Sequence, residues 1–306
     1  MIQCMGNDLL LGETMIDIKA YAKINLFLDI ESRREDGYHN IKSVMQSVDW
    51  YDVIKISKSY SDLSINIKSN NKLVPIDSSN IVYKITKAFL KKCNINSGID
   101  IYIEKNIPIS AGMAGGSSDG AATLKGLNKL FGEPLSLDEL IDMAKSIGAD
   151  IPFLLIGGTK IVKGIGDIIE SCHDIPECYF VCAKDDSACV STPNAYKTLD
   201  KIYNNFNCYT PNDKFNKMIN SLNISDLHGV GDNLFNIFEP VIKSKEKSVS
   251  IIKDILIKNG AINSIMSGSG PSVFGIFDNI NSANIASNEL NKLGINAKAC
   301  KPVFEI

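Results

Sequence analysis

A stretch rich in glycine and serine near the middle of the chain constrains the fold most. Residues 107–131 read IPISAGMAGGSSDGAATLKGLNKLF, with glycines at Gly112, Gly115 and Gly116. Glycines lack a Cβ, so the backbone can approach a ligand closely and point successive N–H groups at it. The apolar spacing from Ala121 onward predicts a helix, whose N-terminus favours an anion. The stretch therefore predicts a phosphate-binding loop that leads into a helix.

The plainer alternative is a flexible connection that ends in an ordinary helix cap, because Gly/Ser clusters between two elements are usually loops. Two details favour the phosphate loop. An alternating strand at residues 99–105 precedes it, and an amphipathic helix follows at once. No lysine follows the glycines as a P-loop requires, and the spacing differs from that of a dinucleotide fingerprint. The loop therefore indicates a kinase architecture other than the P-loop type.

Composition and charge exclude several classes of function. The 306 residues suit two domains or one large one, and a net charge of −3 disfavours a nucleic-acid partner held by bulk electrostatics. No apolar run reaches the ~18 residues of a membrane span, and residues 1–14 lack the features of a signal peptide. The eight cysteines contain no C-x-x-C pair, so we expect reduced cytoplasmic thiols and no structural metal.

Periodicity predicts an α+β chain with a change of character around residues 157–166. The expected strands are 15–30, 52–57, 63–68, 99–105, 178–184, 261–266, 273–277 and 295–303. The expected helices are 80–90, the one after the glycines, 136–148, one from Ser191-Thr192-Pro193, 213–222, 233–240, 246–259 and 282–293. We interpret 52–57 and 63–68 as a β-hairpin.

Four further motifs carry polar residues that chemistry could use. They are AKINL with Lys23, DGYH with Tyr38 and His39, GADIP with Asp150, and MSGSGPS at residues 266–272. Each has a plainer interpretation on its own. A polar residue within a strand often faces water, a lone histidine is more often structural than catalytic, and Asp150 could simply end a helix.

Taken together with the glycine-rich loop, these motifs resemble the GHMP kinase superfamily. The resemblance extends from Met15 to the C-terminus. It implies an N-terminal domain like ribosomal protein S5 domain 2 at residues 15–162 and a ferredoxin-like domain at 163–306. The site would lie between the two domains, and residues 1–14 would be an unmatched extension. The AKINL start and the R-x-D-G-Y-H segment are typical of one branch of the superfamily, whose acceptor is a cytidyl-linked methylerythritol.

The resemblance implies an ATP- and Mg²⁺-dependent kinase of the non-mevalonate isoprenoid route. It would transfer the γ-phosphoryl group to the 2-hydroxyl of the methylerythritol moiety. Asp150 matches the catalytic aspartate and Lys23 the catalytic lysine. A carboxylate within hydrogen-bond reach can accept the hydroxyl proton, and a nearby ammonium keeps that carboxylate ionised.

The resemblance also assigns binding residues. Tyr38 would stack on the cytosine, His39 would hydrogen-bond to it, Tyr196 would close on its other face with Thr192 nearby, and Asn25 would contact the substrate. The expected ATP contacts are Pro108, Ile109, Ser110, Ala111, Gly112, Met113, Ala114, Gly115, Gly116, Ser117 and Ser118, with Asn80 and Lys105 near the adenosine. Ser117 or Ser118 could ligate Mg²⁺, but no carboxylate partner is matched. The loop reads G-M-A-G-G where G-L-G-G-G or G-L-A-G-G is usual, so Met113 replaces a leucine and Ala114 stands where glycine or alanine is usual.

Three rival functions remain open at this point. Another GHMP kinase would act on homoserine, mevalonate or a sugar, although DGYH argues against an acceptor without cytosine. A catalytically silent nucleotide-binding protein would not need both Lys23 and Asp150. An RNA-binding module is disfavoured by the acidic pI of about 5.7. We expect small-molecule partners, no nucleic acid or membrane partner, and a monomer or weak homodimer.

Overall fold

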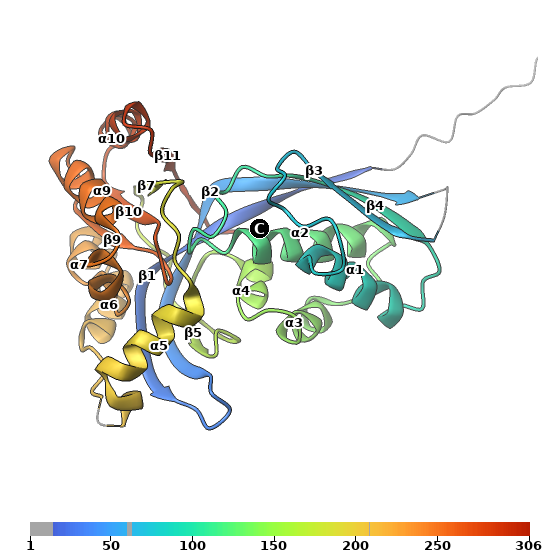
Figure 1. Ribbon diagram of the computed structural model, residues 1–306, viewed down its shortest axis with the longest axis horizontal. Coiled ribbons are helices and arrows are strands. Elements are labelled where there is room, and N and C mark those ends of the chain that lie inside the picture. The colour runs from blue at the N-terminus through green and yellow to red at the C-terminus, as the bar shows by residue number, and fades with distance from the viewer. Residues whose placement is uncertain (1–14, 60–62, 208) are drawn as a thin grey trace, which may run out of the picture.

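Two β-sheets organise the chain, as Figure 1 shows, and confirm the expected α+β class. The structure is a computed structural model that describes residues 15–59, 63–207 and 209–306. The proposed extension at residues 1–14 lies outside these ranges.

The larger sheet is built on two long antiparallel strands, β1 (Ile16–Arg33) and β2 (His39–Ser59). Its main path runs β3-β4-β2-β1-β8, while β5 and β12 also pair with β2 and β6 pairs with β5. The other strands are β3 (Ile65–Ser69), β4 (Gly98–Glu104), β5 (Thr159–Gly164), β6 (Ile168–Ser171), β8 (Phe235–Asn236) and β12 (Pro302–Val303).

The predicted hairpin between residues 52–57 and 63–68 is wrong. Strand β3 pairs in parallel with β4, and β4 lies between β3 and β2. Helix α1 (Ile81–Lys92) connects the two parallel strands as a crossover. Alternating apolar residues identify a strand, but they do not say which strand it pairs with.

Helices α1 to α4 cover one face of the larger sheet (Figure 1). They are α1, α2 (Gly115–Leu130), α3 (Leu137–Lys145) and α4 (Ile151–Ile156). Asn80 caps α1 by accepting a hydrogen bond from the Val82 amide at 2.8 Å. Ser136 and Glu139 form a capping box at the start of α3. These side-chain caps therefore define where α1 and α3, two of the helices around α2, begin.

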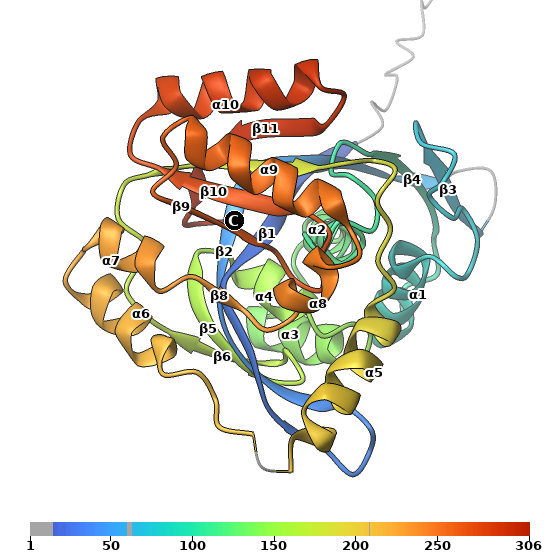
Figure 2. The same cartoon turned by 60° about the vertical axis from the view of Figure 1, so that its left-hand side comes forward.

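The smaller sheet has the order β11-β7-β10-β9, and all of its pairs are antiparallel. Its strands are β7 (Tyr179–Lys184), β9 (Asn263–Met266), β10 (Val273–Phe277) and β11 (Asn296–Cys300). Helices α9 (Lys247–Lys258) and α10 (Ile280–Lys292) pack on it (Figure 2). A β-α-β-β-α-β order with this strand arrangement is the expected ferredoxin-like fold.

The segment between β7 and α9 lacks one predicted helix and contains one, α7, that was not predicted. It contains α5 (Thr192–Ile202), a 3₁₀ turn (Asn204–Phe206), α6 (Lys214–Asn223), α7 (Leu227–Asp232) and α8 (Glu239–Lys243). The helix predicted at 233–240 is wrong, because Phe235 and Asn236 instead pair in parallel with β1 as β8. The buried Asn236 amide donates to the Met266 and Gly268 carbonyls at 2.7 and 2.8 Å, which favours extended backbone there.

The two halves of the chain share the larger sheet. Strand β5 spans the proposed boundary at residues 162 and 163 and pairs with β2. From the second half, β8 pairs with β1 and β12 pairs with β2. The division at this boundary remains a proposal. Within the described ranges, no helix combines the length and apolar character needed to cross a membrane.

Register shifts in β1 decide which way its polar residues face. The pairing with β2 shifts between Tyr21 and Ala22 and again between Asn25 and Phe27. A β-bulge changes the side on which the following residues emerge. Asn25 and Leu28, three positions apart, consequently line the same cavity together with Lys23. Simple alternation would place Leu28 on the opposite face from Lys23.

Candidate active site

A cavity of about 840 Å³ opens where both halves of the chain meet. Its walls come from β1, the turn before β2, the glycine-rich loop, the start of α4, helix α5 and the loop between β9 and β10. Figure 2 shows α5 beside the connection that joins β1 to β2. Motifs that lie far apart in the sequence therefore contribute to one site.

Lys23, Asn25 and Asp150 lie close together in the wall of this cavity. The buried Lys23 Nζ donates to Asn25 Oδ1 at 2.7 Å and lies 4.0 Å from Asp150 Oδ1. Asn25 Nδ2 donates to Ser43 Oγ at 2.8 Å, so β2 holds the asparagine in place. Asp150 precedes α4 and its side chain is 34% exposed. A fixed ammonium thus faces a carboxylate that a ligand can reach.

The glycine-rich loop packs backbone to backbone against the loop between β9 and β10. A Cβ on Gly112, whose φ is +73°, would lie 2.3 Å from the Ser267 carbonyl oxygen. A Cβ on Gly268 would lie 2.7 Å from the Gly112 oxygen. Ser267 Oγ donates to that same oxygen at 3.1 Å, and the Ser272 amide donates to the Ala111 carbonyl at 3.3 Å. The MSGSGPS motif therefore braces the loop.

The loop presents part of its predicted contact set to the cavity. Seven of its residues line the cavity, namely Ser110, Ala111, Gly112, Ala114, Gly115, Gly116 and Ser117. Pro108, Ile109, Met113 and Ser118 do not. Met113 is fully buried, and the buried Ser118 hydroxyl lies 2.8 Å from the Tyr21 carbonyl and 3.1 Å from the Ala114 carbonyl. Ser117 is thus the serine hydroxyl of this pair that faces a ligand, beside the N-terminus of α2.

Aromatic rings also line the cavity. Tyr38 is exposed, whereas His39 stacks on Tyr196 with ring centres 4.7 Å apart. Burial, and then the negative charge of Asp150, raises the pKa of Tyr196 to about 12. The hydroxyl groups of Thr192 and Ser269 lie 2.7 Å apart. Four residues predicted to bind the acceptor all line the cavity, namely Tyr38, His39, Thr192 and Tyr196.

Asp200 also lines the cavity and was not predicted from the sequence. Asp200 Oδ1 lies 2.7 Å from His39 Nε2, and Asp200 Oδ2 lies 3.7 Å from Arg33 Nε. Lys197 and Phe238 also line the cavity and were missed. Asp200 follows Tyr196 by four positions in α5, so both side chains lie on one helix face. That spacing was the signal that could have identified it.

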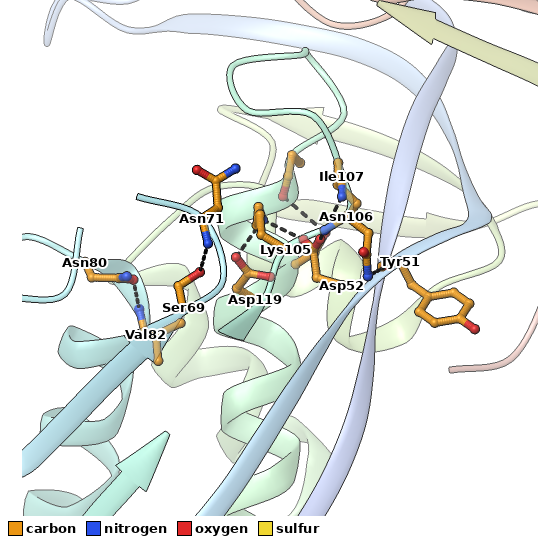
Figure 3. A network of polar contacts seen from close by, with 12 residues as sticks. Tyr51, Asp52, Ser69, Asn71, Asn80, Val82, Lys105, Asn106, Ile107 and Asp119 are labelled. Carbon is orange, nitrogen blue, oxygen red and sulfur yellow. Dashed lines mark hydrogen bonds and ion pairs between the residues drawn. The ribbon is translucent and has the colours of Figure 1, made fainter. Parts of the chain in front are cut away.

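Lys105 lies in a buried polar cluster behind the loop, as Figure 3 shows. Its Nζ is 2.5 Å from Asp52 Oδ2 and 2.7 Å from Asp119 Oδ2. Asp52 Oδ1 in turn accepts the Asn106 and Ile107 amides at 2.5 and 2.7 Å. Lys105 and the helix cap Asn80 are absent from the cavity lining, so their assignment to adenosine remains a prediction. The cluster joins β2, the start of the loop and α2.

The charge balance of this cluster is uneven. Asp119 Oδ1 is buried without a hydrogen-bond partner in the described part of the chain. Burial raises the pKa of Asp119 well above its usual value, although Lys105 opposes the shift. Burial alone would lower the pKa of Lys105, but Asp119 and Asp52 outweigh it and raise that pKa. Lys105 is therefore the cation that two buried carboxylates require.

Two models of known protein families match this chain. The model for the GHMP kinases N terminal domain matches residues 80–158, and the model for the GHMP kinases C terminal region matches residues 218–296. The chain belongs to the GHMP kinase family, which confirms the resemblance inferred from its motifs. Membership of a kinase family implies the use of ATP.

Two curated relatives narrow the comparison. A 4-diphosphocytidyl-2-C-methyl-D-erythritol kinase of Clostridioides difficile is 42% identical over 278 residues, which cover 90% of this chain and 92% of that protein. A protein of the same name from Caldicellulosiruptor saccharolyticus is 42% identical over 264 residues, covering 86% of this chain and 88% of the other.

Solved structures agree in fold. A 4-(cytidine 5'-diphospho)-2C-methyl-D-erythritol kinase has a TM-score of 0.78 at 24% identity and covers 94% of this chain and 99% of its own. A homoserine kinase from Cytophaga hutchinsonii has a TM-score of 0.74 at 18% identity and covers 100% of this chain and 97% of its own. At these identities the likeness shows the shared fold alone.

Removing the Lys105 charge should destabilise the protein rather than weaken ATP binding selectively. Lys105→Met leaves Asp52 and Asp119 buried without their cation, at a cost of about 3–5 kcal/mol in the free energy of unfolding. Urea unfolding measures this. The matched control is Lys55→Met, which breaks the partly exposed pair with Glu104 and should cost about 1 kcal/mol or less. A stable Lys105→Met protein with a raised KM for ATP would instead support the adenosine assignment.

Replacing Ala114 by glycine should stabilise the protein. Ala114 has φ +56° and ψ +29°, a left-handed conformation that costs an alanine about 1–2 kcal/mol. Ala114→Gly relieves that strain but adds freedom to the unfolded chain, so we expect a net gain of about 0.5–1 kcal/mol. Thermal unfolding should show a higher Tm for this variant and a lower Tm for Ala121→Gly, which lies within α2. A lower Tm for both variants would contradict the strain.

Proposed function

We propose that this GHMP kinase transfers the γ-phosphoryl group of ATP to the 2-hydroxyl of 4-diphosphocytidyl-2-C-methyl-D-erythritol in the non-mevalonate isoprenoid route. The carrying observation is that one cavity is lined by the glycine-rich loop, by the Lys23–Asp150 pair and by the stacked rings of His39 and Tyr196. The 40–42% identity to curated relatives of that name supports the same acceptor.

Asp150 would act as the general base for the acceptor hydroxyl. As the hydroxyl oxygen attacks the γ-phosphorus, its proton passes to the Asp150 carboxylate. The bond between the γ-phosphorus and the β,γ-bridging oxygen breaks, and ADP leaves with the electron pair. Lys23 lies 4.0 Å from Asp150, so its positive charge would stabilise the negative charge that develops on the reacting oxygens.

Different residues of the cavity wall would hold the two substrates. The N–H groups at the start of α2 and the glycine-rich loop suit the ATP phosphates. Tyr38, His39 and Tyr196 suit a pyrimidine, because aromatic faces with a hydrogen-bonding edge form a nucleobase pocket. Asn25 and Thr192 also line the cavity and would contact the rest of the acceptor.

The oxygen donors of the cavity fit Mg²⁺. The ion prefers hard oxygen ligands and usually combines one or two protein groups with phosphate oxygens and water. Ser117 lines the cavity and its hydroxyl would be one such ligand, whereas the Ser118 hydroxyl is engaged by backbone carbonyls. When bound, Mg²⁺ would neutralise charge on the phosphates.

An acceptor panel tests the proposed substrate. Purified protein with ATP and Mg²⁺ should release ADP with 4-diphosphocytidyl-2-C-methyl-D-erythritol and not with methylerythritol 4-phosphate, homoserine, mevalonate or galactose. Among these acceptors, only the cytidyl compound has a base that Tyr38, His39 and Tyr196 could bind. Turnover with homoserine or mevalonate alone would favour the other GHMP activities that share this fold. Absence of turnover from folded, ATP-binding protein would favour the silent-binder alternative.

Asp150→Asn should lower kcat by about 10²–10⁴-fold, the range for loss of a general base, while leaving ATP affinity nearly unchanged. Single-turnover ADP formation and ATP titration measure the two effects. The control is Asp142→Asn, an exposed residue of α3 paired with Lys145, which should leave both quantities unchanged. Near wild-type turnover of Asp150→Asn would remove Asp150 from the role of base.

A further inference from the structure

Asp200 determines which nitrogen of the His39 ring is left for a ligand. The Nε2 atom of His39 lies 2.7 Å from Asp200 Oδ1, and both side chains are largely buried, at 6% and 15% exposed. The ring is fixed by stacking on Tyr196 and by the edge of Phe206, whose ring centre is 5.7 Å away. His39 therefore has one orientation, with one of its two nitrogens already committed.

The chemistry of that contact fixes the proton. An ionised carboxylate only accepts hydrogen bonds, so Nε2 must carry a hydrogen and donate it to Asp200. In the neutral imidazole Nδ1 then has a free lone pair and can only accept. Nδ1 makes no hydrogen bond with any residue that the structure describes, and His39 lines the cavity. The ring thus offers an acceptor to the ligand.

We propose that Asp200 is a positioning residue that makes His39 select an amino group over a carbonyl group on the pyrimidine. Cytosine carries an amino donor at C4, where uracil carries a carbonyl acceptor. An Nδ1 acceptor pairs with the first and opposes the second. This inference rests on the proposed cytidyl acceptor and adds the residue that discriminates it from a uridyl acceptor.

Arg33 lies beside the second carboxylate oxygen of Asp200, so it determines how an amide at position 200 would be oriented. Its Nε lies 3.7 Å from Asp200 Oδ2, and its Nη1 donates to Asn205 Oδ1 at 2.6 Å. The oxygen of Asp200 that faces away from His39 is therefore next to a cation. In Asp200→Asn the carbonyl oxygen would keep that place, which puts the amide NH₂ at His39 Nε2. The NH₂ would donate to Nε2 and move the ring proton to Nδ1, so the ligand would meet a donor.

The experiment compares kcat/KM for 4-diphosphocytidyl-2-C-methyl-D-erythritol and for its uridine diphosphate analogue. We expect the wild-type protein to prefer the cytidyl compound by at least about tenfold, the worth of one hydrogen bond to a buried partner. Asp200→Asn should reduce that ratio by about tenfold or more and raise the activity on the uridyl compound. Asp200→Ala should lose activity on the cytidyl compound without gaining activity on the uridyl one.

Two controls separate positioning from damage. Asp213→Asn breaks an exposed pair with Lys217 on α6 and should leave the base preference unchanged. Nitrogen-15 NMR of the histidines reports the tautomer directly, and should show the His39 proton on Nε2 in the wild type and on Nδ1 in Asp200→Asn. The NMR measurement needs no turnover, so an inactive variant still gives a result.

The possible outcomes distinguish an error in the role of Asp200 from an error in the proposed function. If the wild type uses the cytidyl compound but Asp200→Asn keeps the same base ratio and the same tautomer, the role of Asp200 is wrong and the proposed function stands. A wild-type preference for the uridyl compound would overturn the role of Asp200 as well, because His39 would then be a donor. If the wild type uses neither compound, the proposed function fails and the base selection fails with it.

Discussion

The close approach of two backbone segments holds the active site together. Gly112 and the loop at Ser267 and Gly268 come nearer than any side chain would permit, and serine hydroxyl and amide groups bond across the contact. The glycine-rich loop belongs to the first half of the chain and its brace to the second. The Lys23 amide donates to the Met113 carbonyl at 3.2 Å, so this contact and the brace from the second half together fix the loop relative to Lys23. Glycines in both motifs follow from this contact as much as from ligand binding.

Buried polar groups complete the support on the other side of the loop. Lys105 joins Asp52 and Asp119, and Asp52 fixes the amides at which the loop begins (Figure 3). The His39–Asp200 pair plays a comparable part beside Tyr196. In both places an ionic group is buried because it orients a neighbour, since a buried pair by itself adds little net stability.

The sequence predicted much of this arrangement because several signals were local. Capping residues, apolar periodicity and the glycine-rich loop marked the helices, and the motifs around Lys23 and Asp150 identified the family. Local patterns could not show that β3 pairs with β4, nor that Asn236 belongs to a strand held by distant carbonyls. The bulges in β1 were also invisible, because a two-residue alternation assumes an uninterrupted ladder. Lys105 and Asp200 depend on partners 14 or more positions away, so their environments emerge only in three dimensions.

The shared sheet has a consequence for how the protein unfolds. Strands β8 and β12 belong to the second half by sequence, but their backbone hydrogen bonds are made with β1 and β2. Melting the ferredoxin-like half would pull both strands away and expose the edges they cover. The two halves would therefore lose their structure in one cooperative transition, although each matches its own family model.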